Sequence, residues 1–168
     1  MVVNTMAAVS APVLTQRPSD YRPGWAWVMM WIALAAHVTD EALTGFLAVY
    51  NSTVLAIRAQ LGFWPMPTFD FREWLTGMVV GISVFALLSP FAFRNAGWTR
   101  PILYFVAIVA GILNALGHML GTILGHTVST VRFPRPAPGF YSSPLLLIVS
   151  IYALVQLRRT SVRQHPSP

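Results

Sequence analysis

Four long apolar stretches dominate this sequence and limit the folds that the chain can adopt. They comprise residues 25–49, 74–91, 102–124 and 140–157. A bilayer core of about 30 Å is crossed by roughly 17 to 25 helical residues, so each stretch is long enough to span a membrane. Backbone groups in lipid must be satisfied within the protein, and the spans are therefore expected to be helices.

The composition excludes the soluble alternatives. Of the 168 residues, 55% are hydrophobic and only 10% are charged, whereas soluble domains carry about 25% charged residues. So little charge also argues against a disordered chain. The net charge of +6 comes from arginine without lysine, and no cysteine is present to form disulfides or thiolate metal ligands. In membrane proteins, arginines in the tails and loops set the orientation of the chain in the bilayer. We therefore attribute the positive charge to orientation and expect no nucleic-acid partner.

The expected fold is an all-α integral membrane four-helix bundle with up-down-up-down topology. Residues 25–157 form this bundle, residues 1–24 a flexible tail, and residues 158–168 a basic carboxy-terminal tail. A cleaved signal peptide is the alternative for the first stretch, because Ala33-Leu34-Ala35 fits a cleavage site. Apolar residues resume after that site, which favours a retained span.

The arginines also predict the orientation of the chain. If the spans alternate, one side holds Arg17, Arg22, Arg94, Arg100, Arg158, Arg159 and Arg163, and the other holds Arg58, Arg72, Arg132 and Arg135. The positive-inside rule then makes both termini cytoplasmic in a multi-pass protein of the cell membrane, which we expect to be a bacterial inner membrane. The first outer loop has the pattern of a short interfacial helix. Asn51-Ser52-Thr53 would cap its start, residues 54–61 would form it, and Gly62 would end it.

Glycines at four-residue spacing predict close packing of the second and third spans. They are Gly77 and Gly81 in one, and Gly117, Gly121 and Gly125 in the other. Small residues at this spacing allow helix backbones to approach each other in lipid. The same rows of glycines are also compatible with a homo-oligomer.

Ionisable residues inside the apolar stretches point to a site. A charge at the centre of a membrane helix costs about 2.5 to 3.5 kcal/mol, so His37, Asp40 and Glu41 need partners. His37 and Glu41 are four residues apart and share one helix face, as do Asn114 and His118 in the third stretch. Counted from the start of each stretch, His37 and Asn114 lie about 18 Å from the inner surface of the membrane. Glu41 and His118 lie about 24 Å from it. Two parallel helices should bring them face to face.

Imidazole and carboxylate groups, with no thiolate available, suit a hard or borderline divalent cation. We expect His37, Glu41 and His118 to be metal ligands for zinc or iron. The expected catalytic residues are Asp40 or Glu41, which would take a proton, and Asn114, which would orient a ligand. A purely stabilising histidine–carboxylate network is the alternative.

Three segments resemble motifs of the HXXEE-domain family of small bacterial integral membrane proteins. They are His37-Val38-Thr39-Asp40-Glu41, Asn114-Ala115-Leu116-Gly117-His118 and Arg135-Pro136-Ala137-Pro138-Gly139, and their order and rough spacing match along most of the chain. The sequence departs from the family at Asp40, where the family motif has its first glutamate. The resemblance implies that the polar residues of the first two motifs form one set, to which the proline-glycine loop belongs. It implies no particular activity.

The expected function is that of a membrane-embedded, metal-dependent enzyme, a hydrolase or an oxidoreductase, acting on a lipid or other hydrophobic substrate. A metal-free acid/base isomerase, a module for proton or metal-ion transport and a structural membrane subunit are the alternatives. His126 lies about 12 Å beyond His118 along a helix and is left outside the site. Arg132 and Arg135 suit a phosphate or carboxylate, with the headgroups of membrane lipids as the favoured ligands.

Overall fold

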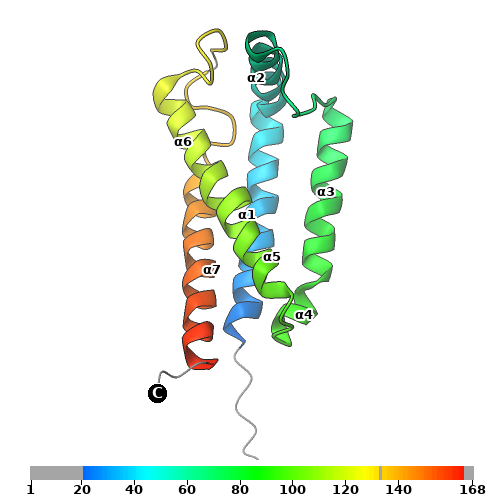
Figure 1. The fold of residues 1–168 in the computed structure, drawn as a ribbon, viewed down its shortest axis with the longest axis vertical. Helices are drawn as coiled ribbons and strands as arrows, with labels where there is room; N and C mark the ends of the chain where they lie inside the picture. The colour runs from blue at the N-terminus through cyan, green and yellow to red at the C-terminus, as the bar shows by residue number, and fades with distance from the viewer. Residues whose placement is uncertain (1–20, 133, 165–168) are drawn as a thin grey trace, which may run out of the picture.

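The computed structural model describes residues 21–132 and 134–164, and this part of the chain is helical apart from its loops and an isolated β-bridge between His126 and Arg132. The elements are α1 (Arg22–Thr44), α2 (Phe46–Leu61), α3 (Phe71–Leu87), α4 (Ser89–Phe93), α5 (Thr99–Val106), the π-helix η1 (Ala107–Leu113), α6 (Asn114–Leu124) and α7 (Ser143–Gln164). Figure 1 shows α1, α3, the continuous rod α5–η1–α6 and α7 side by side along the long axis. α2 lies across one end of the molecule.

Two helical segments, Phe71–Phe93 and Thr99–Leu124, are long and apolar enough to cross a membrane. The bent pair α1 and α2 adds a third if it is one span. The expectation of an all-helical chain with helices able to cross a membrane is therefore confirmed. α7 is not among these segments, because it begins at Ser143 rather than at residue 140 and carries Arg158 and Arg159 towards its end.

The expected tails are partly helical. Residues 1–20 and 165–168 lie outside the described residues. Arg22, Pro23 and Gly24, assigned to the first tail, belong to α1 instead, and Pro23 lies at the helix start, where its missing N–H costs no hydrogen bond. Residues 158–164 continue α7.

Gly45 ends the first helix earlier than predicted. Its φ of 79° is left-handed, and its N–H donates to Glu41 O, which closes the last turn of α1. The chain then bends by 80° into α2. The predicted straight helix over residues 25–49 is therefore wrong. The predicted short helix in this loop exists and ends before Gly62, but it begins at Phe46, so that residues 51–53 lie inside it and do not cap it.

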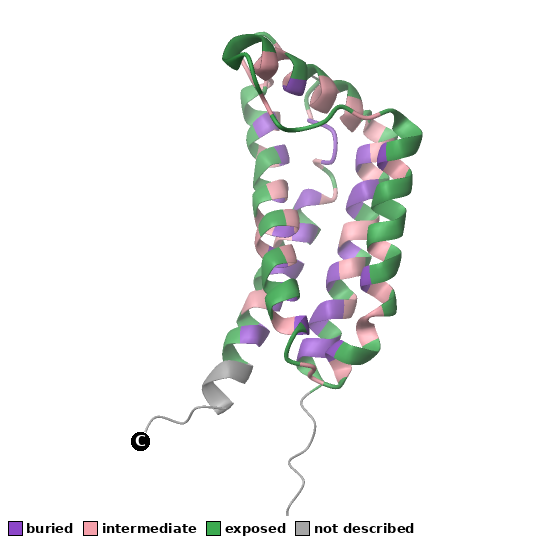
Figure 2. Ribbon diagram, turned by 45° about the vertical axis from the view of Figure 1, so that its right-hand side comes forward, coloured by how far each residue is buried: buried purple, intermediate pink, exposed green. Residues whose placement is uncertain are grey.

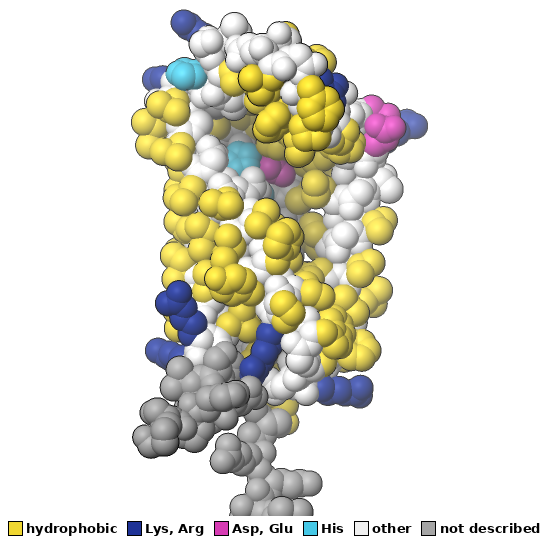
Figure 3. All heavy atoms as spheres, viewed as in Figure 1, with side chains coloured by type: hydrophobic (Ala, Val, Ile, Leu, Met, Phe, Trp, Pro, Cys, Tyr) yellow, Lys and Arg dark blue, Asp and Glu magenta, His cyan; other side chains and the backbone are white. Residues whose placement is uncertain are grey.

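The hydrophobic core lies where α1, α5 and α7 meet, with contributions from α3 and α4. Trp27 is fully buried there and stacks on Phe85 with ring centroids 4.0 Å apart. Its Nε1–H donates to Phe85 O at 2.7 Å. Figure 2 shows that buried residues follow the inward faces of the helices and exposed residues the outward faces. Many outward residues are large and apolar, and Figure 3 shows them covering the middle of one face, as a lipid-facing surface requires.

Three of the glycines predicted to draw the spans together, Gly77, Gly81 and Gly117, do not do so within the described residues. A Cβ added at Gly77, Gly81 or Gly117 would meet nothing within 4 Å. The close approach occurs instead at Gly111 in η1, where a Cβ would collide with the Ser150 side chain of α7. η1 thus packs on α7 and directly precedes the first residue of α6.

Candidate metal centre

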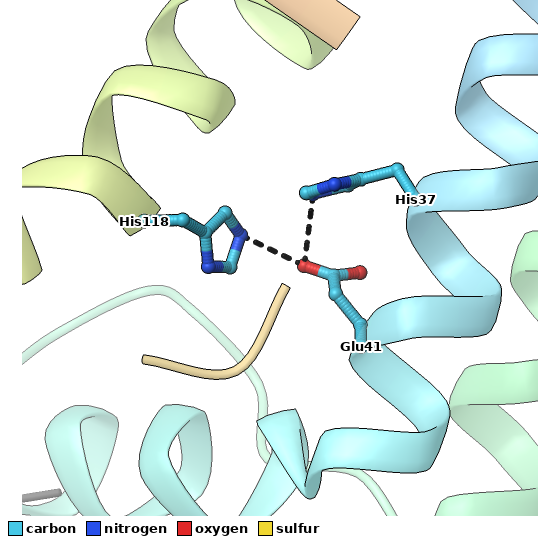
Figure 4. Close-up of side chains that lie close together, drawn as sticks. All are labelled: His37, Glu41 and His118. Atoms are coloured by element: carbon cyan, nitrogen blue, oxygen red, sulfur yellow. Dashed lines mark ion pairs between the residues drawn. The ribbon is translucent and has the colours of Figure 1, made fainter. Parts of the chain in front are cut away.

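His37, Glu41 and His118 converge between α1 and α6 (Figure 4). His37 and Glu41 lie one turn apart on α1, and α6 supplies His118. Glu41 Oε1 lies 3.0 Å from His118 Nε2 and 3.5 Å from His37 Nε2. His37, Glu41 and His118 are 1%, 4% and 8% exposed, respectively. The expectation that these side chains face each other across two helices is confirmed.

The spacing of these atoms suits a small cation. One ligand atom from each residue lies within 4.8 Å of the other two. Zinc bonds of about 2.0 to 2.1 Å in tetrahedral geometry place neighbouring ligand atoms about 3.3 Å apart. The two separations from Glu41, 3.0 and 3.5 Å, lie close to this value. These residues could therefore hold a divalent metal ion with small adjustments of their side chains.

Asn114 joins the cluster at the His37 side. Its Nδ2 lies 3.0 Å from His37 Nε2. Asn114 is half-buried and follows η1 directly, one helical turn before His118 on α6. An amide N–H that donates to Nε2 requires a lone pair on that nitrogen, which is also the state that binds a metal ion.

Asp40 lies outside the three-residue cluster and contacts Ser142 instead. Asp40 Oδ2 accepts hydrogen bonds from the backbone N–H and from Oγ of Ser142, both at 2.8 Å. Ser142 Oγ also lies 2.8 Å from His37 Nδ1. Because an ionised carboxylate only accepts, the hydroxyl donates to Asp40 and its lone pair is left to accept from His37 Nδ1–H. This chain of contacts fixes the His37 tautomer with the proton on Nδ1 and the lone pair on Nε2, as in metal sites whose histidines are oriented by an outer hydrogen bond.

The proline-glycine loop, residues 135–139, covers the cluster. Gly139 has a φ of 78°, and a Cβ there would lie 2.9 Å from His118 Cε1 and 3.0 Å from Glu41 Cγ. Ala137, Pro138 and Gly139 are buried. A residue with a side chain at position 139 would collide with His118 and Glu41. The close approach of the loop to the site therefore requires glycine at this position.

Two threonines hold this loop in place. Thr44 Oγ1 donates to Asp40 O in its own helix and accepts from Gly139 N–H at 3.0 Å. Thr122 Oγ1 donates to His118 O and accepts from Ala137 N–H at 2.9 Å. Each helix that carries site residues thus also anchors the loop, so the cover and the cluster are positioned together.

An apolar cavity of about 220 Å³ lies beside His118. Phe46 and Val49 of α2, Leu113 of η1, and Asn114 and His118 of α6 are among its lining residues. Figure 3 shows histidine and acidic side chains at the bottom of a hollow that apolar side chains surround. The cluster is therefore reachable from an apolar surface.

Sequence reasoning missed Ser142 and the role of the two threonines as anchors of the loop, whereas the family resemblance had already implied that the loop ending at Gly139 belongs with the site. Thr44 lies on the face of α1 that carries His37 and Glu41, a position that its spacing predicts. Ser142 has no such pattern, because it reaches the site only through the path of the loop. His126 lies outside the cluster, as expected.

Comparisons with protein-family models, with curated proteins and with solved structures find no match for this chain. Its function is therefore argued from the chemistry of the site. A buried carboxylate between two imidazoles can bind a cation or exchange a proton, and both occur in membrane-embedded sites.

Proposed function

We propose that this chain is a membrane-embedded metalloenzyme in which His37, Glu41 and His118 bind one divalent cation. The observation that carries the proposal is the convergence of three buried ligand-type side chains from two helices, with ligand atoms within 4.8 Å of each other. A carboxylate buried away from water is unfavourable unless a positive charge or hydrogen bonds compensate it. A bound cation would provide that compensation.

The donor set favours zinc or iron. Two imidazole nitrogens and one carboxylate oxygen occur both in catalytic zinc sites and in non-haem iron sites, and both types leave a coordination position open. Zinc would supply a Lewis acid for hydrolysis, and iron would supply a redox centre for oxidation. In either case Asp40 and Ser142 would orient His37, and Asp40, the carboxylate that does not bind the cation, would be available to hold a proton.

A hydrophobic substrate fits the surroundings of this centre. The cavity beside His118 has an apolar lining, and Asn114 is a polar side chain on its wall that can orient a substrate group by hydrogen bonding. Substrate would enter between α2 and α6 from the lipid phase, where a lipid or similar amphiphile is available. The reacting group would then lie against His118.

The same proposal includes the membrane topology. We place α1, α3, the rod α5–η1–α6 and α7 as four spans of a bacterial inner membrane protein with cytoplasmic termini. The side-by-side arrangement of these helices and the basic side chains at both ends of the apolar surface support this placement. Membership of the HXXEE-domain family remains a proposal that rests on the three short motifs. Association into a homo-oligomer, for example through the open glycine face of α3, also remains a prediction.

A metal-free acid/base site is the second candidate. It is favoured by the 3.0 Å contact between Glu41 Oε1 and His118 Nε2, which needs no ion to form. In that case His118 would exchange a proton with a substrate in the apolar cavity, and Glu41 would stabilise its charged form. Transport is less favoured, because the end of the core opposite the site contains large apolar side chains such as Trp27, Met30 and Leu103.

Metal content distinguishes the two candidates. Protein purified in detergent without chelators should contain one zinc or iron ion per chain by elemental analysis. His37→Ala and His118→Ala should lose the ion while keeping the helical circular dichroism of the wild type, and His126→Ala, outside the cluster, should keep it. Wild-type protein that is folded but takes up neither metal would contradict the metalloenzyme proposal and leave the acid/base site.

A further inference from the structure

A second cavity lies beyond the end of α6, at the end of the molecule where α2 lies. Its volume is about 400 Å³, and Leu124, Gly125, His126, Ser129, Arg132 and Arg135 line it. None of these residues belongs to the metal cluster. The cavity therefore needs a separate explanation.

The backbone after α6 brings its polar residues together. α6 ends at Gly125, whose φ of 73° turns the chain, and an antiparallel bridge then pairs His126 with Arg132. Arg135 Nη2 donates to Leu124 O at 2.9 Å, and its guanidinium lies so close to Gly125 that a Cβ there would be 2.6 Å from Nε. Arg135 thus caps the carbonyl end of α6 and opposes the negative end of the helix dipole. A guanidinium has five N–H donors, so others remain for a ligand.

The positive charge of this cavity is not balanced by nearby acids. The sequence contains no aspartate or glutamate after Glu73. Among the described residues, no acid forms an ion pair with Arg132 or Arg135. Figure 3 shows basic and histidine side chains gathered at the upper left, over the loop that follows α6. The cavity is therefore an electropositive recess.

His126 adds a third nitrogen-bearing side chain to the cavity. Its Nδ1 is enclosed by protein, and in the described part of the chain it has no hydrogen-bond partner. Buried polar nitrogens are nearly always hydrogen-bonded, and one without a partner costs stability. A rotation of the imidazole towards the cavity would let an N–H of this ring donate to a ligand that accepts hydrogen bonds, and would remove that cost.

We infer that this cavity is an oxyanion site and that its ligand is inorganic phosphate or carries a phosphate monoester group. Arginine forks match the oxygen geometry of phosphate and carboxylate. A phosphate monoester has three terminal oxygens and a charge of about −1.5 to −2 at neutral pH, which matches two guanidinium groups and a third donor on His126. A carboxylate offers only two oxygens and a single charge. The group belongs either to free phosphate or to a phosphorylated amphiphile, because the cavity adjoins the end of Thr99–Leu124, a segment able to cross a membrane.

Binding assays on the purified full-length protein test this inference. Inorganic phosphate is titrated by calorimetry, and phosphatidic acid, a monoester, is compared with phosphatidylglycerol, a diester, in nanodiscs observed by phosphorus NMR. We expect the protein to bind inorganic phosphate or phosphatidic acid in preference to the diester. Binding of both inorganic phosphate and phosphatidic acid identifies the phosphate group as sufficient, and binding of phosphatidic acid alone identifies the amphiphile as the source.

The variants assign the binding to this cavity. Arg132→Ala should weaken monoester binding roughly 10- to 100-fold, since hydrogen bonds to charged groups are strong, and Arg132→Lys should recover only part of the loss. Arg72→Ala, which removes an exposed arginine of α3, is the matched control and should bind like the wild type. Equal losses in Arg72→Ala and Arg132→Ala, or no monoester binding by the wild type, would overturn the inference. Metal content is measured on the same samples, so this result is independent of the fate of the metal centre.

Discussion

Replacing Gly139 with alanine tests how closely the proline-glycine loop covers the candidate metal centre. The added Cβ would lie 2.9 Å from His118 Cε1 and 3.0 Å from Glu41 Cγ. These distances are shorter than ordinary carbon–carbon contacts, which are about 3.5 to 4.0 Å. The loop or the two site residues must therefore move. Gly45 is a matched control, because its φ of 79° is similar but an added Cβ would meet nothing within 4 Å.

The magnitude follows from the comparison of these two glycines. A left-handed conformation costs a residue with a Cβ about 1 to 2 kcal/mol, and this cost applies to both substitutions. Overpacking adds about 1 to 3 kcal/mol, and this cost applies only at Gly139. Gly45→Ala should therefore lower the free energy of unfolding by about 1 to 2 kcal/mol, and Gly139→Ala by about 2 to 5 kcal/mol. Strain that the metal-free site relieves by moving, and that metal binding restores, also weakens metal binding, tenfold for each ~1.4 kcal/mol.

The two free energies of unfolding are measured by denaturant titration in mixed micelles and followed by tryptophan fluorescence. Metal affinity is measured in parallel by competition with a chromogenic chelator. Gly139→Ala should be the less stable variant and should bind metal more weakly than Gly45→Ala. If both variants lose the same stability and both bind metal like the wild type, the loop does not lie against His118 and Glu41 in the way described.

Two further substitutions test the outer contacts of the site and the start of α3. Ser142→Ala removes the hydroxyl between Asp40 and His37 and should weaken metal binding about 10- to 100-fold, while Ser142→Thr should restore it; chelator competition that gives Ser142→Ala the wild-type affinity would refute the orienting role. Asp70→Ala removes the capping box with Glu73 and should lower the free energy of unfolding by about 0.5 to 2 kcal/mol without changing metal content. An unchanged unfolding midpoint in thermal scans would show that this cap does not stabilise α3.

The meeting of His37 and Glu41 with His118 was predictable because two regularities of helices suffice for it. Four-residue spacing fixes which side chains share a face, and the rise per residue fixes their depth. Charged groups in lipid must also face the interior. None of this reasoning requires the details of loops or packing. The membrane-compatible helices are predictable for the same reason, since length and hydropathy decide them.

The remaining contacts depend on information that is not periodic. Ser142 approaches Asp40 and His37 only because the loop returns over the site, and an isolated serine carries no pattern that reveals such a path. Gly45 is a helix stop, but the apolar residues after it resemble a continued span, and hydropathy cannot distinguish the two. Asn51 resembles a capping residue, yet its side chain instead bonds the backbone of Phe69, a contact that depends on tertiary structure. Gly77 and Gly81 have the spacing of a packing motif, but spacing does not specify a partner.

The π-helix η1 has a consequence for how the centre is encoded. It ends at Leu113, and the next residues on the rod are those that contact His37 and Glu41. A π-turn winds one residue more than an α-turn, so a chain with one residue fewer in η1 would form a continuous α-helix there with little rotation of the segment that follows. A residue inserted or deleted in α5 would instead rotate Asn114 and His118 by about 100° relative to α1. Insertions and deletions in α5 should therefore be less tolerated than substitutions.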